Sequence, residues 1–171
     1  RNTGLKAASG EWIYFLDSDD ELEEHALDIM LKYIQNDCQW IIFNYSKLIA
    51  ETKKRYVNEM AEAEYELHRD KEAFPQLLNE QVFMLQGGKL YRRDLIEKQQ
   101  LYFKKDVAYG EDIRFNMQYF QYVNQYIISS IPIFVYKIRK SEGAGSAYYE
   151  EAFQMQMDID QEILYMVKNH Y

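Results

Sequence analysis

The hydrophobic pattern of the first 34 residues predicts a strand between two helices. Asn2 to Ala8 are typical of a short helix, and we expect Gly10 to cap its C-terminal end. Trp12 to Leu16 form a continuous apolar run, whose length predicts a strand buried on both faces. The acidic run Glu21 to Glu24 precedes apolar residues at helical spacing, which predicts a helix that starts there and extends to Ile34.

The middle of the chain alternates between clear and weak patterns. Trp40 to Tyr45 predict a second buried strand, and the charged stretch Leu48 to Arg69 is interpreted as hairpin strands with an excursion. Asp70 to Leu78 are compatible with a short helix. Lys89 to Arg93 are expected to lead into a helix that begins near Asp94.

The last third predicts two helices with short strands between and before them. Tyr102-Phe103 are expected to form a brief strand, and apolar spacing from Glu111 onward predicts a helix. Ile127–Ile131 and Ile133–Ile138 are expected to be two short strands bent at the proline between them, and Ala152–Val167 an amphipathic helix. Residues 1–171 are therefore expected to form a single mixed α/β domain.

Composition narrows the possible partners and compartments. The formal charge of −8 argues against nucleic acid as a partner, because nucleic-acid binding requires a basic face for the phosphates. The single cysteine, Cys38, cannot form an internal disulfide, which fits a reducing compartment. No apolar run approaches the roughly 20 residues that a membrane-spanning helix needs.

An acidic cluster, Asp17-Ser18-Asp19-Asp20, follows the first buried run directly. Ligand sites of open α/β sheets lie outside the carboxyl ends of strands, and carboxylates suit Mg²⁺, Mn²⁺ or Ca²⁺. By itself the cluster is more typical of a helix cap made by Asp19 or Asp20. A calcium loop is disfavoured, because Leu22 stands where such a loop needs glycine.

A second acidic pair, Glu111-Asp112, follows Gly110 at the expected start of a helix. Acidic residues in a first turn offset the helix dipole, so this pair taken alone is also more typical of a helix start than of a catalytic group.

Residues 1–20 resemble the central signature of family-two glycosyltransferases of the GT-A fold. In that family an Arg-Asn-x-Gly-Leu helix leads to Gly-Glu-Tyr-Ile-x-Phe-Leu-Asp-x-Asp-Asp, and Trp12 is the one departure here. Gly110-Glu111-Asp112 matches the Gly-Glu-Asp of the same family, in the same order along the chain. The resemblance implies a GT-A-type mixed sheet flanked by helices.

The resemblance also implies roles for individual residues. Asp112 matches the general base, with Glu111 beside it as a second catalytic residue, and Asp17 and Asp19 match ligands of a divalent metal, Mn²⁺ or Mg²⁺. Asn2 and Gly4 match positions on the nucleotide side of the donor site, and Asp17 and Arg92 are also expected to bind substrate. Arg1 matches an arginine that is either a structural ion-pair partner or a donor contact.

The function so implied is an inverting glycosyltransferase that moves a sugar from a nucleoside-diphosphate sugar to a hydroxyl of a carbohydrate or lipid-linked sugar acceptor. Bacterial surface polysaccharide biosynthesis is the expected setting, in the cytoplasm or at the inner face of the membrane. Two alternatives stay open: a non-catalytic carbohydrate- or metal-binding module, and an assembly subunit on the same scaffold.

Family members carry a further half-domain, with the first strands of the nucleotide-binding sheet, before the segment that starts here at Arg1. We therefore expect a GT-A domain truncated at its N-terminal nucleotide-binding half. Such a truncation would expose a sheet edge, and we expect homo-oligomers to form through it.

Overall fold

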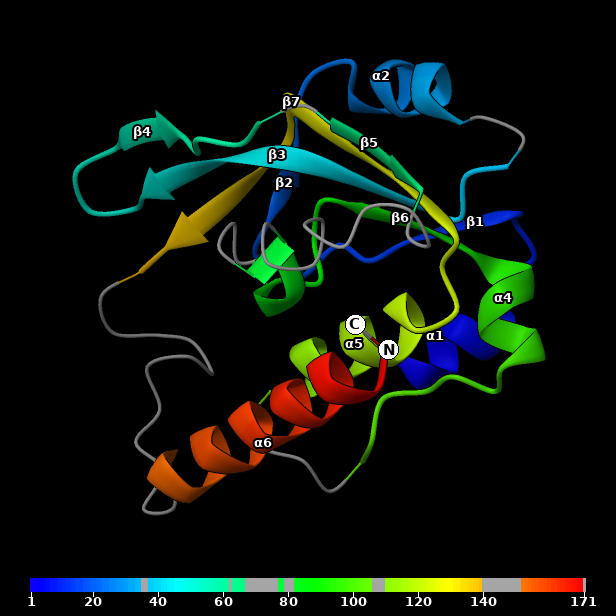
Figure 1. Cartoon of the computed structure of the whole chain (residues 1–171). Coiled ribbons are helices and arrows are strands. Elements are labelled where there is room, and N and C mark those ends of the chain that lie inside the picture. Colours follow the sequence, from blue (N-terminus) through cyan, green and yellow to red (C-terminus); the bar gives the residue numbers. More distant parts are fainter. Residues whose placement is uncertain are drawn as a thin grey trace.

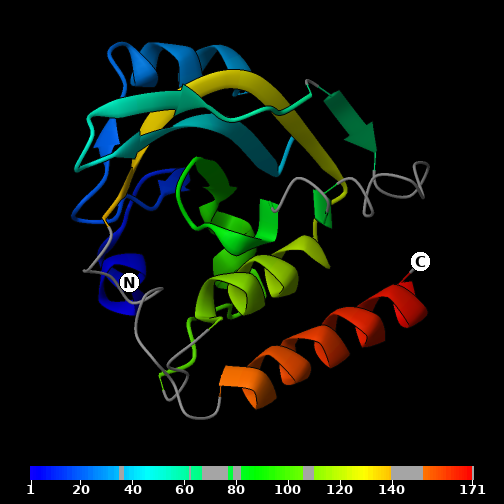
Figure 2. The ribbon, with the colours of Figure 1, turned by 90° about the vertical axis from the view of Figure 1, so that its left-hand side faces the viewer.

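The structure, a computed structural model, describes residues 1–34, 37–61, 63–66, 77–78, 82–105, 110–139 and 152–170. Its centre is a seven-stranded mixed sheet, with helix α2 on one face and helices α5 and α6 on the other (Figures 1 and 2). The strands are β1 (Trp12–Tyr14), β2 (Glu21–Leu22), β3 (Trp40–Ile49), β4 (Lys54–Val57), β5 (Ala63–Glu66), β6 (Lys89–Arg92) and β7 (Gln125–Ile138). The helices are α1 (Asn2–Ala7), α2 (Ala26–Tyr33), the 3₁₀ helix η1 (Val82–Met84), α4 (Arg93–Lys98), α5 (Glu111–Phe120) and α6 (Ala152–His170).

Strand β3 organises the sheet. The main path runs β1-β6-β3-β7-β2, with β4 added to β3 and β5 added to β7. β3 runs parallel to β7 and antiparallel to β6, and its first residues are buried on both faces, as their continuous apolar sequence predicts. The hairpin strands predicted in the stretch from Leu48, the helix predicted near Asp94 (α4) and helices α5 and α6 are also confirmed, whereas strand β6 was not predicted.

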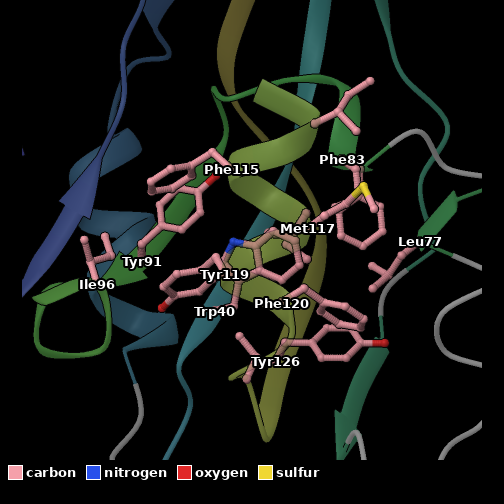
Figure 3. Packing of buried hydrophobic residues seen from close by; sticks show 14 of the residues in the cluster. Trp40, Leu77, Phe83, Tyr91, Ile96, Phe115, Met117, Tyr119, Phe120 and Tyr126 are labelled. Carbon is pink, nitrogen blue, oxygen red and sulfur yellow. The ribbon is translucent and has the colours of Figure 1, made fainter. Parts of the chain in front are cut away.

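Two cores lie on the two faces of the sheet. The larger is built around Trp40, which is fully buried and surrounded by rings from β6, α5, β7 and η1 (Figure 3). These rings belong to Phe83, Tyr91, Tyr119, Phe120 and Tyr126. On the opposite face, Ala26 and Met30 of α2 pack against Ile41 and Phe43 of β3. No helix in the described part of the chain has the length and apolar character to cross a membrane.

The predictions for the first strand and its preceding helix need correction. Only Ile13 is buried in β1, and Leu16 is 46% exposed, because β1 lies at the end of the sheet path and pairs with β6 alone. Helix α1 ends where Ala8 turns to an extended conformation, so Gly10 does not cap it.

The helix predicted from Glu21 begins instead at Ala26. Glu21 and Leu22 form strand β2 against Val135 and Phe134 of β7, and the Glu23 N–H donates to the Ile133 carbonyl at 2.8 Å. Long-range strand pairing therefore overrides the local helical spacing.

Two strand predictions in the second half were also wrong. β7 is one continuous strand, and at Pro132, which lacks an N–H, its ladder with β3 shifts register instead of ending. Tyr102-Phe103 is not a strand, because the backbone of Phe103 bonds to a side chain instead. The predicted helix Asp70–Leu78 lies outside the described residues, apart from its last two positions.

A glycine-specific contact before β6 leads to a stability prediction. Gly88 has φ +73°, and a Cβ placed on it would lie 2.7 Å from a ring carbon of Phe134 and 3.1 Å from the Phe43 carbonyl oxygen. We expect Gly88→Ala to lower the free energy of unfolding by about 1–3 kcal/mol, measured by urea denaturation. Gly4→Ala is the matched control: an added Cβ has no atom within 4 Å, so it should be neutral or stabilising.

Candidate active site

The guanidinium of Arg1 joins the two acidic motifs. Its Nη2 lies 3.1 Å from Asp17 Oδ1, its Nη1 lies 3.2 Å from Glu111 Oε1, and Nη1 also pairs with Asp112. The same guanidinium lies over the ring of Phe103, 5.2 Å from the ring centre. Residues far apart in the sequence thus form one cluster, which we call the Arg1 cluster: Arg1, Asp17, Glu111 and Asp112.

Aromatic packing places Asp17 in this cluster. Phe15, which follows β1, makes edge contacts with the rings of Tyr91, Phe103 and Phe115 at centroid distances of 5.4–5.7 Å. The chain then turns, and the Asp20 N–H donates to the Asp17 carbonyl at 3.1 Å. Asp17 therefore begins a turn that is held in place by the packing of Phe15 in the core, two residues earlier.

A glycine turn places Glu111 and Asp112. Gly110 begins α5 with φ +76°, and a Cβ at this position would lie 2.4 Å from Ile159 of α6. α6 therefore packs closely on the turn that carries the acidic pair. Glu111 and Asp112 form the first turn of α5, as the interpretation of this pair as a helix start predicts, and both side chains also pair with Arg1.

Asp112 has the electrostatics expected of a base near neutral pH. Its side chain is 19% exposed, and burial raises its pKa to about 6. Arg1 opposes this shift, while Glu111 and Asp17 add to it through like-charge repulsion. A carboxyl with such a pKa is ionised at pH 7 yet more basic than an ordinary aspartate, which favours proton abstraction.

The three aspartates of the acidic turn differ in exposure and in hydrogen bonding. The Asp17 side chain is 45% exposed and Asp19 is exposed, whereas Asp20 accepts a hydrogen bond from the Lys137 N–H at 3.2 Å. Burial raises the pKa of Asp20 to about 6. Helix α2 begins beyond this turn without a side-chain cap, so the capping role considered for Asp19 or Asp20 is wrong.

Asp17 and Asp19 are the residues present that could hold a metal. Among the described residues, no group of three or more His, Cys, Asp or Glu side chains is arranged to bind one. Mg²⁺, however, is commonly held by one or two carboxylates and completed by substrate phosphates. Two carboxylates on one turn fit that donor set.

The two substrate-binding candidates on α1 have different surroundings. Asn2 Nδ2 donates to the Phe103 carbonyl at 2.7 Å, and the Phe103 N–H donates back to Asn2 Oδ1 at 2.8 Å. This pair fixes the segment whose ring lies beneath Arg1. Gly4 is exposed, and a Cβ added to it would have no atom within 4 Å.

Arg92 lies apart from the Arg1 cluster. It pairs in register with Trp12 at the start of β1, whereas Asp17 follows the end of that strand. Its guanidinium contacts Glu11 at 3.2 Å and Asp94 at 3.3 Å. The structure therefore does not bring Arg92 together with the other candidate residues.

Sequence reasoning missed two groups near the acidic motifs. Lys137 pairs with Glu21, and the pKa of its neighbour Tyr136 is raised by burial and by Asp20. Lys89 of β6 is buried and interacts electrostatically with Asp112. Its only sequence signal was the Lys-Leu-Tyr-Arg-Arg stretch, in which the arginines are equally conspicuous.

Comparison with known proteins identifies the family of the chain. The model of glycosyl transferase family 2 matches residues 1–99, and the chain belongs to this family. The putative glycosyltransferase EpsH of Bacillus subtilis is 29% identical over 143 residues, covering 82% of this chain and 41% of EpsH. The poly(ribitol-phosphate) beta-N-acetylglucosaminyltransferase TarP of Staphylococcus aureus is 31% identical over 132 residues, or 76% of this chain and 38% of TarP.

A solved structure shows the same fold. The structure of S. aureus TarS 1-349 in complex with UDP-GlcNAc matches with a TM-score of 0.70 and 23% identity, covering 95% of this chain and 45% of that one. The GT-A-type fold expected from the sequence is thereby confirmed. The chain spans less than half the length of each of these relatives.

Proposed function

We propose that the protein carrying this chain is an inverting glycosyltransferase, which moves a sugar from a nucleoside-diphosphate sugar to a hydroxyl of a carbohydrate or lipid-linked acceptor. The observation that carries the proposal is the Arg1 cluster, which brings Asp17 and Asp112 together in a chain of glycosyl transferase family 2. The relatives TarP and TarS are poly(ribitol-phosphate) beta-N-acetylglucosaminyltransferases, which supports a role in bacterial surface polymers.

Asp112 is the proposed general base. An acceptor hydroxyl is a poor nucleophile until its proton is removed as attack proceeds. The hydroxyl oxygen would form a bond to the anomeric carbon while the bond from that carbon to the diphosphate oxygen breaks. The proton goes to Asp112, and attack opposite the leaving group inverts the anomeric centre.

The donor would lie over the acidic turn and α1. Asp17 and Asp19 would hold Mg²⁺ or Mn²⁺, which when bound stabilises negative charge on the leaving nucleoside diphosphate. Asn2 and Gly4 of α1 are the residues proposed to lie on the nucleotide side of the donor. We place the reaction in the cytoplasm, or at the inner face of the membrane where lipid-linked acceptors reside.

The proposal predicts metal-dependent donor turnover by the full-length protein. Hydrolysis or transfer would be measured with a panel of nucleoside-diphosphate sugars and Mn²⁺ or Mg²⁺. Asp19→Ala is expected to reduce turnover by on the order of a hundredfold or more, because a metal supplies several kcal/mol of transition-state stabilisation. Asp28→Ala, which removes an exposed acid from α2, is the matched control and should retain activity.

Two outcomes would overturn the proposal. A folded protein that turns over no donor and binds no nucleotide would favour a non-catalytic module. Full activity in Asp19→Ala, or activity that survives chelation of divalent ions, would remove the metal from the mechanism.

A further inference from the structure

Lys89 is a buried lysine that the proposed mechanism has not used. The residue is 3% exposed, and its Nζ donates to the carbonyl of Leu85 and, at 3.3 Å, to that of Gly87. Among the described residues no carboxylate lies within ion-pair distance of it. Lysine is almost never fully buried unless paired, because removing its charge from water is costly.

A buried polar network connects Lys89 to α5. The Leu85 carbonyl that binds Lys89 also accepts a hydrogen bond from Asn116 Nδ2 at 3.0 Å. Asn116 Oδ1 accepts from the Tyr91 hydroxyl at 2.7 Å, and that hydroxyl accepts from Gln86 Nε2 at 3.0 Å. The network thus joins β6 and the segment before it to helix α5.

The network reaches helix α5 one turn away from Asp112. Asn116 is one helical turn after Asp112, so the two side chains share a face of α5. Asn116 is fully buried and also donates to the Phe83 carbonyl at 2.9 Å. Fixing Asn116 therefore fixes the rotation of the helix about its axis, and with it the direction of Asp112.

Electrostatics links the same two positions. Burial lowers the pKa of Lys89 to about 7, and Asp112 opposes that shift. Because an interaction between two charges is mutual, protonated Lys89 favours the ionised form of Asp112. The other groups that act on Asp112 come from three segments of the chain: Arg1, Asp17 and Glu111, with the buried hydroxyl of Tyr91.

We propose that Lys89 is a positioning residue for Asp112: its ammonium group holds the Leu85 carbonyl that orients Asn116, and supplies a buried positive charge behind the carboxylate. The role in transfer rests on the proposed function, whereas the link between Lys89 and Asp112 does not.

Stability distinguishes this role from a merely structural one. The pKa of Lys89 in the folded protein, about 7, lies below its ordinary value of 10.5, so protonation favours unfolding. The resulting destabilisation is full below pH 7 and disappears as the pH rises to 10.5. Replacing Lys89 by an apolar side chain of similar length should therefore leave Tm unchanged or raise it, while the Leu85 carbonyl keeps its bond from Asn116.

The test compares Lys89→Met, Lys89→Gln and Lys98→Met in the full-length protein. Lys98 is an exposed lysine on α4 and serves as the matched control. We expect Lys89→Met to lower kcat by about ten- to a hundredfold, with KM little changed, because the ammonium no longer holds the Leu85 carbonyl in place for Asn116 and its charge is lost. Lys89→Gln keeps an N–H donor without the charge, so its loss in kcat should be smaller.

The effect of the Lys89 charge on Asp112 is measured separately from the change in kcat. In both Lys89 variants the acid limb of the pH profile of kcat/KM should move to higher pH. The pKa of Asp112, measured from the NMR titration of its carboxyl carbon, should also move to higher pH. That NMR signal is assigned by its absence in Asp112→Asn. Lys98→Met should change neither.

An unchanged Asp112 titration in both Lys89 variants would overturn the proposal, whether or not the protein is active. If Lys89 shifts the Asp112 titration but the wild-type protein turns over no donor, the electrostatic link holds and the proposed function fails.

Discussion

Asp112→Asn is expected to lower sugar transfer by about two to four orders of magnitude, the range in which a general base contributes. Asparagine keeps the size of the side chain but cannot accept the proton of an attacking hydroxyl. The loss should appear in kcat, because the acceptor and donor can still bind. It would be measured in the full-length protein with the donor that the wild type turns over.

Glu111→Gln is the matched control for this substitution. Glu111 also contacts Arg1, at 3.2 Å, but its side chain is 35% exposed, against 19% for Asp112. Replacing Glu111 should lower kcat by about tenfold at most, since the substitution removes a charge beside the base but not the base itself. A larger loss in Glu111→Gln than in Asp112→Asn would reverse the assignment of the two carboxylates.

Asp112→Asn also tests the electrostatics of the site independently of activity. The pKa of Asp112 is raised from 3.8 to about 6, so its ionisation favours unfolding. That cost is absent below pH 3.8 and fully present above pH 6. Asp112→Asn should therefore match or exceed the wild-type Tm at pH 7.5, and the difference should shrink toward pH 4. A variant clearly less stable at pH 7.5 would show that the ion pair with Arg1 outweighs burial.

The parts of the fold that sequence predicted are those set by local pattern. Strand β3 follows from an apolar run with no polar interruption, and α5 from apolar residues at helical spacing after a glycine. The start of α2 could not be found this way. Glu21 and Leu22 have the spacing and charge of a first helical turn, yet β7 supplies a long-range partner that pairs with them.

The candidate site shows the same contrast between what a local pattern predicts and what long-range packing decides. Asp17 and Asp112 could be found because each belongs to a motif, and Arg1 because it begins one. One guanidinium binds both carboxylates because long-range packing brings the turn after β1 and the start of α5 together, and no local spacing in the sequence encodes that packing. Arg92 and Lys89 show the limit most clearly: three residues apart, they project to different environments, and sequence favoured the arginine that points away.

Arg1→Gln is also expected to have a large effect on transfer. Without the guanidinium, Asp17, Glu111 and Asp112 would repel one another with no counter-charge between them. Arg1 holds down the pKa of Asp112, so its loss should raise that pKa further above 6 and leave less of the base ionised at pH 7. We expect transfer at pH 7 to fall on the order of a hundredfold and to recover partly at higher pH.

Two further variants separate charge from geometry. Arg1→Lys keeps the charge but lacks the planar fork that contacts three carboxylates, so it should restore the pH profile more than it restores kcat. Arg93→Gln removes an arginine that is ion-paired with Glu97 outside the Arg1 cluster, and should leave the profile unchanged. If Arg1→Gln lowers activity equally at every pH, Arg1 acts by contacting the donor and not by controlling Asp112.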